Sequence, residues 1–213
     1  MPELPEVETM RRYLENHIVG QTIIDILILN PNSLLHDTSF DANVIQGKRI
    51  THLDRVGKKL LIYLTDNLII AVHFKMSGSF YIREEGEVDE HDRVILKLSS
   101  MNLNFHDPRK FGKILITREI NKALYKIGVD ALSENLDASL IYSIFSSHNM
   151  VIKRLLLDQS FIAGIGNIYA DEILYASRIH PLTNSRRITK ATCEELLINM
   201  KRILNLSIRY QGT

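Results

Sequence analysis

The chain begins MPELPE, which combines an amine nucleophile with nearby carboxyl groups. Once Met1 is removed, Pro2 becomes the N-terminus and carries a secondary amine on a rigid ring. An α-amino group titrates near pH ~7.7–8.0, so an appreciable fraction is neutral at pH 7 and can attack a carbonyl carbon. A secondary amine stops at the iminium ion, which is a strong electron sink. Glu3 offers an adjacent carboxyl for proton transfer, and Glu6 lies one helical turn further along the same face.

A simpler interpretation makes the same residues the start of a helix. Proline is favoured at the first helical position, and acidic residues suit the positive end of the helix dipole. The apolar spacing of Val7, Met10, Leu14 and Ile18 then predicts an amphipathic helix. The two interpretations are compatible, because a helix behind the terminus would hold the amine in place.

Composition restricts the class of protein. The 213 residues carry a net charge of only +1, with a sequence pI near 7.9, so a nucleic-acid surface must be local. Cys193 is the single cysteine, which excludes a disulfide framework or a cysteine-rich zinc site within this chain. The sequence has no signal-peptide pattern and no apolar run of membrane-spanning length. We therefore expect a cytoplasmic protein.

The first part of the chain is dominated by short β-strands. Asp66-Asn67 is typical of a hairpin turn, and residues 84–92 form an acidic loop. Many short strands separated by turns are typical of a sandwich or barrel. The predicted strands cover residues 22–29, 49–56, 60–65, 68–74, 79–83, 94–98, 103–106 and 113–117.

The apolar spacing becomes helical after residues 121–135. Four helices are predicted, the last from about Thr189 to Ile208, with Thr192 and Glu195 as a capping box inside its start. The expected fold class is α+β: an N-terminal β-sandwich or barrel-like domain fronted by one helix, residues 1–125, then a helical domain, residues 126–213.

Several loops carry residues suited to nucleic acid. Arg55, Lys58 and Lys59 form a basic cluster, which is either a solvated hairpin or a set of phosphate contacts. Met76, in the glycine-containing run HFKMSGS, is either a core methionine or a wedge between bases. Arg109 and Phe111 lie in the run HDPRKFG. They belong either to a charged turn with one buried ring or to a DNA-binding loop, in which Arg109 pairs with an orphaned base and Phe111 is a wedge beside it.

The helical half contains the run IAGIGNIYADE, in which Gly164 and Gly166 come just before a helix. Free N–H groups at a helix N-terminus bind anions, and glycines let a phosphate approach closely. A glycine-rich turn between helices is the simpler alternative. His91, alone in an acidic loop, indicates nothing by itself.

MPELPEVETMRR resembles the start of the formamidopyrimidine-DNA glycosylases, bacterial enzymes that remove oxidised purines. Leu4 makes the related endonuclease VIII group, which usually has glycine there, a weaker match. VGKKLL, HFKMSGS, HDPRKFG and the IAGIGNIYADE run resemble further family segments in the same order. The resemblance covers the whole chain and implies a helix–two-turn–helix motif in the helical domain.

The resemblance also implies roles for individual residues. Pro2 would be the nucleophile, Glu3 the acid–base residue and Lys58 the essential hairpin lysine, whereas Lys59 departs from the family's usual aromatic residue. Glu6 is a further acidic candidate with a structural role. The base-stack wedge would comprise Met76, Arg109 and Phe111. The residues expected to contact DNA are His91, Arg109, Lys153 and Asn167.

The resemblance implies a zinc finger of four cysteines beyond the position at which this sequence stops, so we expect no metal or cofactor in this chain. We expect a monomer that acts on double-stranded DNA with oxidised bases or abasic sites, associated with the bacterial nucleoid. The expected function is a bifunctional glycosylase and abasic-site lyase that uses a proline Schiff base and β,δ-elimination. The alternatives are a damaged-DNA-binding remnant without turnover, and an enzyme for oxidised pyrimidines.

Overall fold

The computed structural model describes residues 1–35 and 41–212. These residues form two compact units, the first comprising Met1–Pro2 and Val7–Tyr125, the second Glu3–Glu6 and Lys126–Thr213. The first turn of helix α1 (Leu4–Ile18) belongs to the second unit because Leu4 packs into that unit's core.

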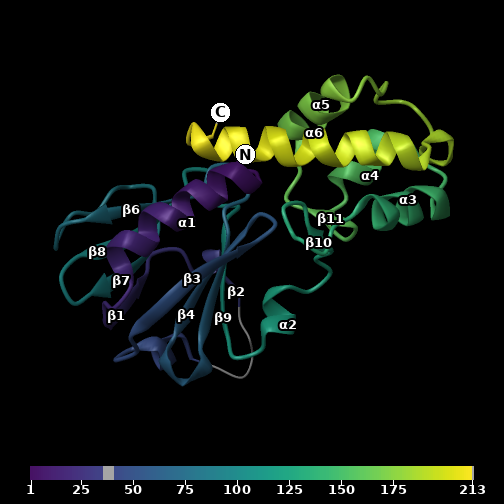
Figure 1. Ribbon diagram of the computed structural model, residues 1–213. Helices are drawn as coiled ribbons and strands as arrows, with labels where there is room; N and C mark the ends of the chain where they lie inside the picture. The colour runs from purple at the N-terminus through teal and green to yellow at the C-terminus, as the bar shows by residue number, and fades with distance from the viewer. Residues whose placement is uncertain (36–40, 213) are drawn as a thin grey trace. The chain divides into compact units, whose positions relative to one another are not determined.

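The first unit is a β-sandwich, shown at the lower left of Figure 1. One sheet has the strand order β1-β7-β8-β6 and the other β2-β9-β5-β4-β3. Their bounds are β1 (Ile23–Ile28), β2 (Leu34–Leu35), β3 (Ile50–Val56), β4 (Lys59–Leu64), β5 (Ile69–His73), β6 (Ser79–Arg83), β7 (Asp92–Leu98), β8 (Asn102–His106) and β9 (Lys113–Thr117), with short helices η1 (Pro31–Ser33), η2 (Ala42–Ile45), η3 (Thr65–Asn67) and α2 (Ile120–Ala123).

The inward faces of the two sheets share one apolar core with α1. Val72 of one sheet and Phe105 of the other belong to the same buried cluster, together with Leu14 of α1. The predicted hairpin turn is confirmed, since Asp66 and Asn67 have φ values of 60° and 57°, the left-handed conformation that a tight turn between β4 and β5 requires. With the helices described below, the α+β fold class is confirmed.

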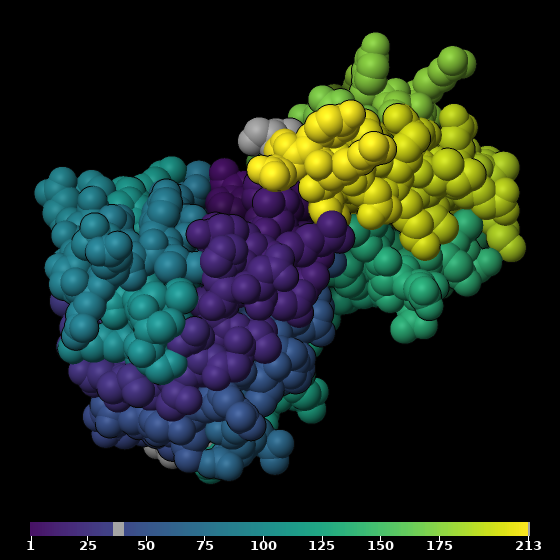
Figure 2. All heavy atoms as spheres, turned by 60° about the vertical axis from the view of Figure 1, so that its left-hand side comes forward, coloured from purple at the N-terminus to yellow at the C-terminus, as the bar shows by residue number. Residues whose placement is uncertain are grey.

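Helix α1 follows the amphipathic pattern that its sequence predicts. Val7, Leu14 and Ile18 are buried, whereas Arg12 and Tyr13 are exposed. The purple atoms of α1 accordingly remain on the molecular surface in Figure 2. The buried apolar stripe stabilises this helix, because a favourable first turn alone does not make a short helix stable.

One carboxylate on α1 organises three arginines. Glu8 is 8% exposed and lies within 3.2 Å of nitrogen atoms of Arg11, Arg12 and Arg55. Burial alone would raise the pKa of Glu8, but the hydrogen bonds from Arg11 and Arg12 and the charges of Arg11 and Arg55 lower that pKa to about 2. The ion pair therefore ties α1 to β3, and Arg55 is committed to this contact.

We predict that Glu8→Gln lowers the free energy of unfolding at pH 7 by on the order of 3 kcal/mol. The pKa of Glu8 is lower in the folded protein than in the unfolded chain, so the ionised carboxylate stabilises the fold at every pH above the unfolded pKa. The difference from the wild type should decline as the pH falls from 4.5 towards 2, where Glu8 becomes protonated. Urea unfolding at pH 7, 5 and 3 measures this. Glu15→Gln, an exposed partner of Arg11, should cost less than about 1 kcal/mol, and equal effects of the two variants would contradict the assignment.

The second unit is helical, and its longest helix, yellow in Figure 1, packs against two others. Its core includes Phe145, Tyr169 and the single cysteine, Cys193, as an apolar buried residue. Its elements are β10 (Val129–Asp130), α3 (Ala138–Ser147), α4 (Ile152–Leu157), β11 (Ile162–Ala163), α5 (Asn167–Ala176), η4 (Ser185–Arg187) and α6 (Lys190–Arg209), with β10 and β11 parallel.

The start of α6 corrects one detail of the sequence analysis. The N-cap is Thr189, whose side chain accepts a hydrogen bond from the N–H of Thr192, so Thr192 and Glu195 do not form the capping box that was predicted. The pattern misled because Thr192 satisfies the same spacing one turn too late. Across the residues that the structure describes, none of the helices has the length and apolar character needed to cross a membrane.

Candidate functional site

The Glu3 carboxylate sits at the N-terminus of α5. Glu3 is only 2% exposed, and its Oε2 accepts a hydrogen bond from the N–H of Gly166 at 2.6 Å and a longer one from Tyr169 at 3.4 Å. Oε1 accepts from the N–H of Ile168 at 3.0 Å. Helix N-termini have unpaired N–H groups and a positive dipole end, so this arrangement fixes a carboxylate in one orientation. From the sequence, this glycine-containing turn was either a phosphate-binding helix start or a simple turn between helices; in the structure its N–H groups hold the Glu3 carboxylate.

Glu6 supports the same segment from the other side of the turn. One oxygen of its carboxylate accepts the backbone N–H of Glu3 at 2.8 Å, and the other accepts the hydroxyl of Tyr169 at 2.6 Å. The Tyr169 hydroxyl also contacts the Oγ of Ser207 on α6. Tyr169 is therefore more than a packing residue, and sequence reasoning missed Ser207 because no local pattern marks it.

Two glycines allow the N-terminal segment to lie this close to α5. A Cβ on Gly166 would lie 2.3 Å from the carboxyl carbon of Glu3. A Cβ on Gly164, whose φ is +115°, would lie 2.5 Å from Cδ1 of Leu4. Both distances are far inside van der Waals contact, so the glycines are required by Glu3 and Leu4 rather than by the turn alone.

For the activity that the sequence resemblance implies, we predict that Gly166→Ala reduces base release by about 100-fold, because the new methyl group must displace the Glu3 carboxylate and small displacements of a catalytic group cost about this much. Single-turnover base release measures the effect. Gly86→Ala is the control, since nothing lies within 4 Å of a Cβ there; its φ of +88° adds a backbone strain that Gly166, with a φ of −120°, does not have. A fully active Gly166→Ala protein would show that Glu3 does not need this position.

The hairpin lysine is on the first unit. Lys58 follows Gly57 in the turn between β3 and β4 and is 7% exposed. Its two neighbours in the predicted basic cluster have other partners: Arg55 binds Glu8 and the carbonyl of Gly57, and the Nζ of Lys59 donates to the carbonyl of Ala123. The members of the predicted cluster thus have different surroundings, and Lys58 stays a candidate phosphate ligand because of the family resemblance.

The two candidate wedge loops are pinned to each other. The Ser77 hydroxyl donates to Oδ1 of the fully buried Asp107 at 2.5 Å and accepts the N–H of Arg109 at 3.2 Å. Oδ2 of Asp107 accepts the N–H of Gly112 at 2.7 Å. Asp107 was not among the predicted site residues, although an Asp at the head of a Pro- and Gly-containing loop is a recognisable turn signal.

This anchoring leaves the three predicted wedge side chains outside the core. Met76 is 43% exposed and Phe111 is 50% exposed. The guanidinium of Arg109 lies over the ring of Phe111, 5.2 Å from its centroid. Exposed apolar side chains on rigid loops can enter a base stack without first unfolding anything.

His91 lies in a different part of the first unit, beside a polar cluster. Its ring is 5.5 Å from that of His106, and Arg93 approaches its Nδ1 at 3.4 Å. His106, Asp89 and Asp92 have ligand atoms within 4.8 Å of one another, the spacing of a cation site. Asp92 already accepts hydrogen bonds from Asn104 and from the N–H of Asp89, however, so we assign the cluster a structural role.

The two residues predicted to contact DNA on the helical unit lie on consecutive helices. Lys153 is in the first turn of α4, and its Nζ is 2.7 Å from a carboxylate oxygen of Asp171 on α5. Asn167 is the exposed first residue of α5. The α4–turn–α5 geometry therefore brings a cation and an amide to one end of the motif.

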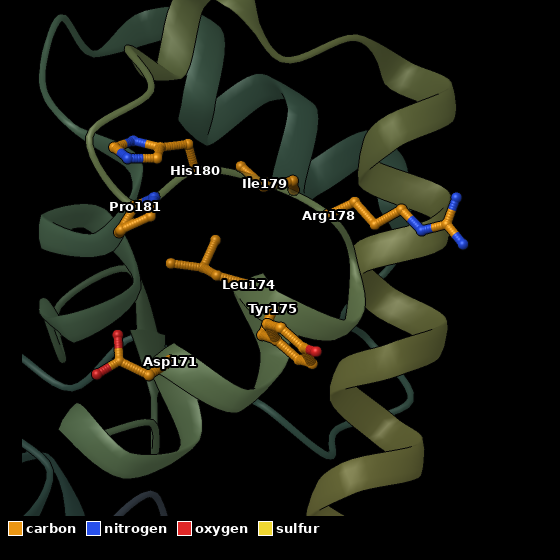
Figure 3. Close-up of a pocket in the computed structure, with 7 residues that line it drawn as sticks. All are labelled: Asp171, Leu174, Tyr175, Arg178, Ile179, His180 and Pro181. Carbon is orange, nitrogen blue, oxygen red and sulfur yellow. The ribbon is translucent and has the colours of Figure 1, made fainter.

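Asp171 also borders a cavity of about 500 Å³ between α5 and the segment that follows it, with Leu174, Tyr175, Arg178, Ile179, His180 and Pro181. Figure 3 shows Leu174 near its centre, whereas the Arg178 side chain extends away from it. None of the candidate catalytic residues lines this cavity, so we do not place the reaction there.

Comparison with known proteins resolves the family. The family model of the formamidopyrimidine-DNA glycosylase N-terminal domain matches residues 1–114, and the family model of the formamidopyrimidine-DNA glycosylase H2TH domain matches residues 127–213. The chain belongs to the formamidopyrimidine-DNA glycosylase family. It is therefore a DNA glycosylase of base excision repair with abasic-site lyase activity.

Named relatives agree with this family. The chain is 38% identical to the formamidopyrimidine-DNA glycosylase of Ureaplasma parvum over an alignment of 222 positions, and 38% identical to that of Cronobacter sakazakii over one of 217. Each alignment covers all of this chain and 80% of the relative.

Solved structures of one formamidopyrimidine-DNA glycosylase, that of Lactococcus lactis, share the fold. A mutant of that enzyme in complex with Fapy-dG DNA superimposes with a TM-score of 0.93 at 32% identity, covering 100% of this chain and 80% of that one. The same enzyme with abasic-site DNA gives a TM-score of 0.92, covering 99% and 80%. With one cysteine, this chain cannot itself form a four-cysteine zinc finger.

Proposed function

We propose that the chain removes oxidised purines, namely 8-oxoguanine and formamidopyrimidines, from duplex DNA and then cleaves the strand at the abasic site. The observation that carries the proposal is the Glu3 carboxylate, which directly follows the candidate nucleophile Pro2 in the sequence. The N–H groups of Gly166, Ile168 and Tyr169, at the start of α5, fix this carboxylate. The Lactococcus lactis complexes with Fapy-dG and abasic-site DNA support these substrates. Because the substrate is chromosomal DNA, the protein would act at the bacterial nucleoid, in the cytoplasm.

The reaction begins once Met1 has been removed and the damaged nucleotide has been flipped out of the duplex. The nitrogen of Pro2 attacks C1′ of the sugar, and the bond from C1′ to the base nitrogen breaks as the base leaves with a proton. Opening of the sugar ring gives an iminium ion on Pro2, and Glu3 moves the protons that ring opening requires.

Strand cleavage follows from the electron-withdrawing iminium. A proton is lost from C2′, and the 3′ phosphate leaves in a β-elimination. A second, δ-elimination expels the 5′ phosphate. Water then hydrolyses the iminium, which releases the sugar fragment and restores the Pro2 amine.

The remaining candidate residues bind the substrate. Lys58 would hold a phosphate beside the flipped nucleotide, because a lysine ammonium neutralises a phosphate as a point charge. Met76 and Phe111 would fill the gap in the base stack, and Arg109 would pair with the orphaned base.

The proposed backbone contacts lie outside the reacting centre. Lys153 and Asn167 would contact the phosphates that flank the lesion through their side chains. His91 would contact the backbone further away. Glu6 would support Glu3 by accepting the backbone N–H of Glu3, and it has no proposed contact with the reacting atoms.

A duplex with a single 8-oxoguanine tests the proposal directly. We expect release of the free base, measured by chromatography, together with strand cleavage at the lesion, and neither product from the same duplex with guanine. A protein that binds the lesion duplex but releases no base would contradict the proposal and support the alternative of a damaged-DNA-binding protein without turnover.

A further inference from the structure

Three basic side chains form a row across neighbouring strands of the sheet with the order β2-β9-β5-β4-β3. Lys59 of β4 pairs with His73 of β5, and His73 pairs with Lys113 of β9. Residues paired in this way project to the same face of a sheet, so Lys59 and Lys113 lie on one face, on either side of His73. Two positive charges on one face favour an anion or another compensating group against that face.

The hydrogen-bond partners of the two lysines do not neutralise them. The Nζ of Lys59 donates to the carbonyl of Ala123 at 2.5 Å, and the Nζ of Lys113 donates to the carbonyl of Asn32. A carbonyl orients an ammonium group but carries no net charge, so neither contact neutralises its lysine.

Burial lowers the pKa of His73, and the charges of Lys75, Lys59 and Lys58 lower it further, to about 4. The pKa of Lys59 is itself lowered, first by burial and then by the charge of Lys75. His73 is therefore neutral at pH 7 and retains one N–H donor.

The row borders a cavity of about 240 Å³. A water molecule occupies roughly 30 Å³ of liquid, so the cavity has room for a tetrahedral anion and several waters. Lys122 of α2 adds another ammonium group, which pairs with Glu119 at 2.7 Å. The other residues that line the cavity are Leu35, Ala71, Leu115, Ala123 and Tyr125.

We propose that this cavity binds a phosphate group, with Lys59 and Lys113 as its cationic ligands and His73 as a hydrogen-bond donor. Lys58, the proposed phosphate ligand at the lesion, is not among the residues that line this cavity, although its charge acts on His73. The occupant of the cavity is either a phosphodiester of a nucleic-acid strand or free phosphate. Phosphate binding at this cavity is independent of catalysis, and the experiments below do not measure catalytic activity.

The first experiment compares thermal unfolding in sodium phosphate and in sodium chloride at equal ionic strength. We expect phosphate to raise the midpoint of the wild type by about 2–4 °C, because a ligand that binds only the folded state stabilises it. The double variant Lys59→Met/Lys113→Met should lose this rise, yet in chloride it should be at least as stable as the wild type, since a repulsion has been removed.

Lys97→Met is the matched control. Lys97 lies on the other sheet and pairs with Asp25 at 3.4 Å, so this variant should keep the full response to phosphate. The proposal is overturned if the wild type shows no rise specific to phosphate, or if the folded double variant shows the same rise.

A second measurement identifies the source of the phosphate. If the site holds a DNA phosphodiester, the slope of log K against log salt for an abasic duplex should fall in the double variant by ~0.9 for each lost contact. If the site holds free phosphate, that slope should match the wild type while the thermal response is lost. Both outcomes support a phosphate site, and DNA binding alone, without turnover, suffices to separate them.

Discussion

Replacing Pro2 by glycine should reduce strand cleavage at a preformed abasic site by about 100-fold or more. Glycine leaves a primary amine, so the chain keeps a nucleophile but loses the rigid ring that places it. Misplacing a reacting group by about 1 Å can cost about this factor. A primary amine also gives an imine that can lose its proton and its charge, whereas the iminium of proline stays charged and continues to withdraw electrons.

The Pro2→Gly measurement needs proteins whose N-termini have been verified by mass, because retained Met1 would convert either residue into an amide. Single-turnover cleavage of an abasic duplex gives the rate, and duplex binding at the same salt concentration serves as the folding and recognition control. Undiminished cleavage by a correctly processed Pro2→Gly protein would rule out the proline as the nucleophile.

Glu3→Gln should lower the rate of base release from an 8-oxoguanine duplex by roughly 100- to 10,000-fold, the usual contribution of a general acid–base group. Cleavage of a preformed abasic site should fall less, because no base has to leave. The variant should also be destabilised by about 1–3 kcal/mol, because both carboxylate oxygens accept N–H groups and an amide must turn its own NH2 towards one of them.

The Glu3→Gln result is interpreted against Glu15→Gln, which removes an exposed carboxylate of the same helix. Glu15→Gln should retain both activities. A Glu3→Gln protein that loses stability but releases base at the wild-type rate would show that Glu3 is a structural anchor for α5 and not an acid–base residue.

Local sequence patterns predicted much of the fold. The strands at 79–83 and 113–117 match β6 and β9. The Asp66-Asn67 turn was identified because few residues tolerate a positive φ, and helix α1 because its apolar residues repeat at the helical period. These features depend on interactions between residues close in sequence, which a pattern can represent.

The contacts of the site residues could not be predicted in the same way. Glu3 binds N–H groups more than 160 residues away, and Ser77 meets Asp107 across two loops. Such partners are chosen by how the elements pack, and the residues involved have no distinctive spacing. The family resemblance indicated that Glu3 and Met76 matter, but the physical reasons come from the structure.

The row of Lys59, His73 and Lys113 could not be predicted from the sequence for the same reason. Lys59, His73 and Lys113 lie in three separate segments, and only the strand register shows that they share one face. A one-residue change of register would place them on opposite faces. From the sequence, Lys59 was noticed as part of the basic cluster with Arg55 and Lys58 and as a departure from the family's aromatic residue, and neither observation connects it to His73 or Lys113.

The most direct test of the account is to map the covalent intermediate. Processed protein is incubated with an abasic duplex and borohydride, which reduces the iminium to a stable bond, and the cross-linked protein is digested and analysed by mass spectrometry. The account predicts that the sugar remnant is attached to the N-terminal peptide, on the nitrogen of Pro2. Attachment to a lysine such as Lys58, or no cross-link despite tight binding of the duplex, would contradict it.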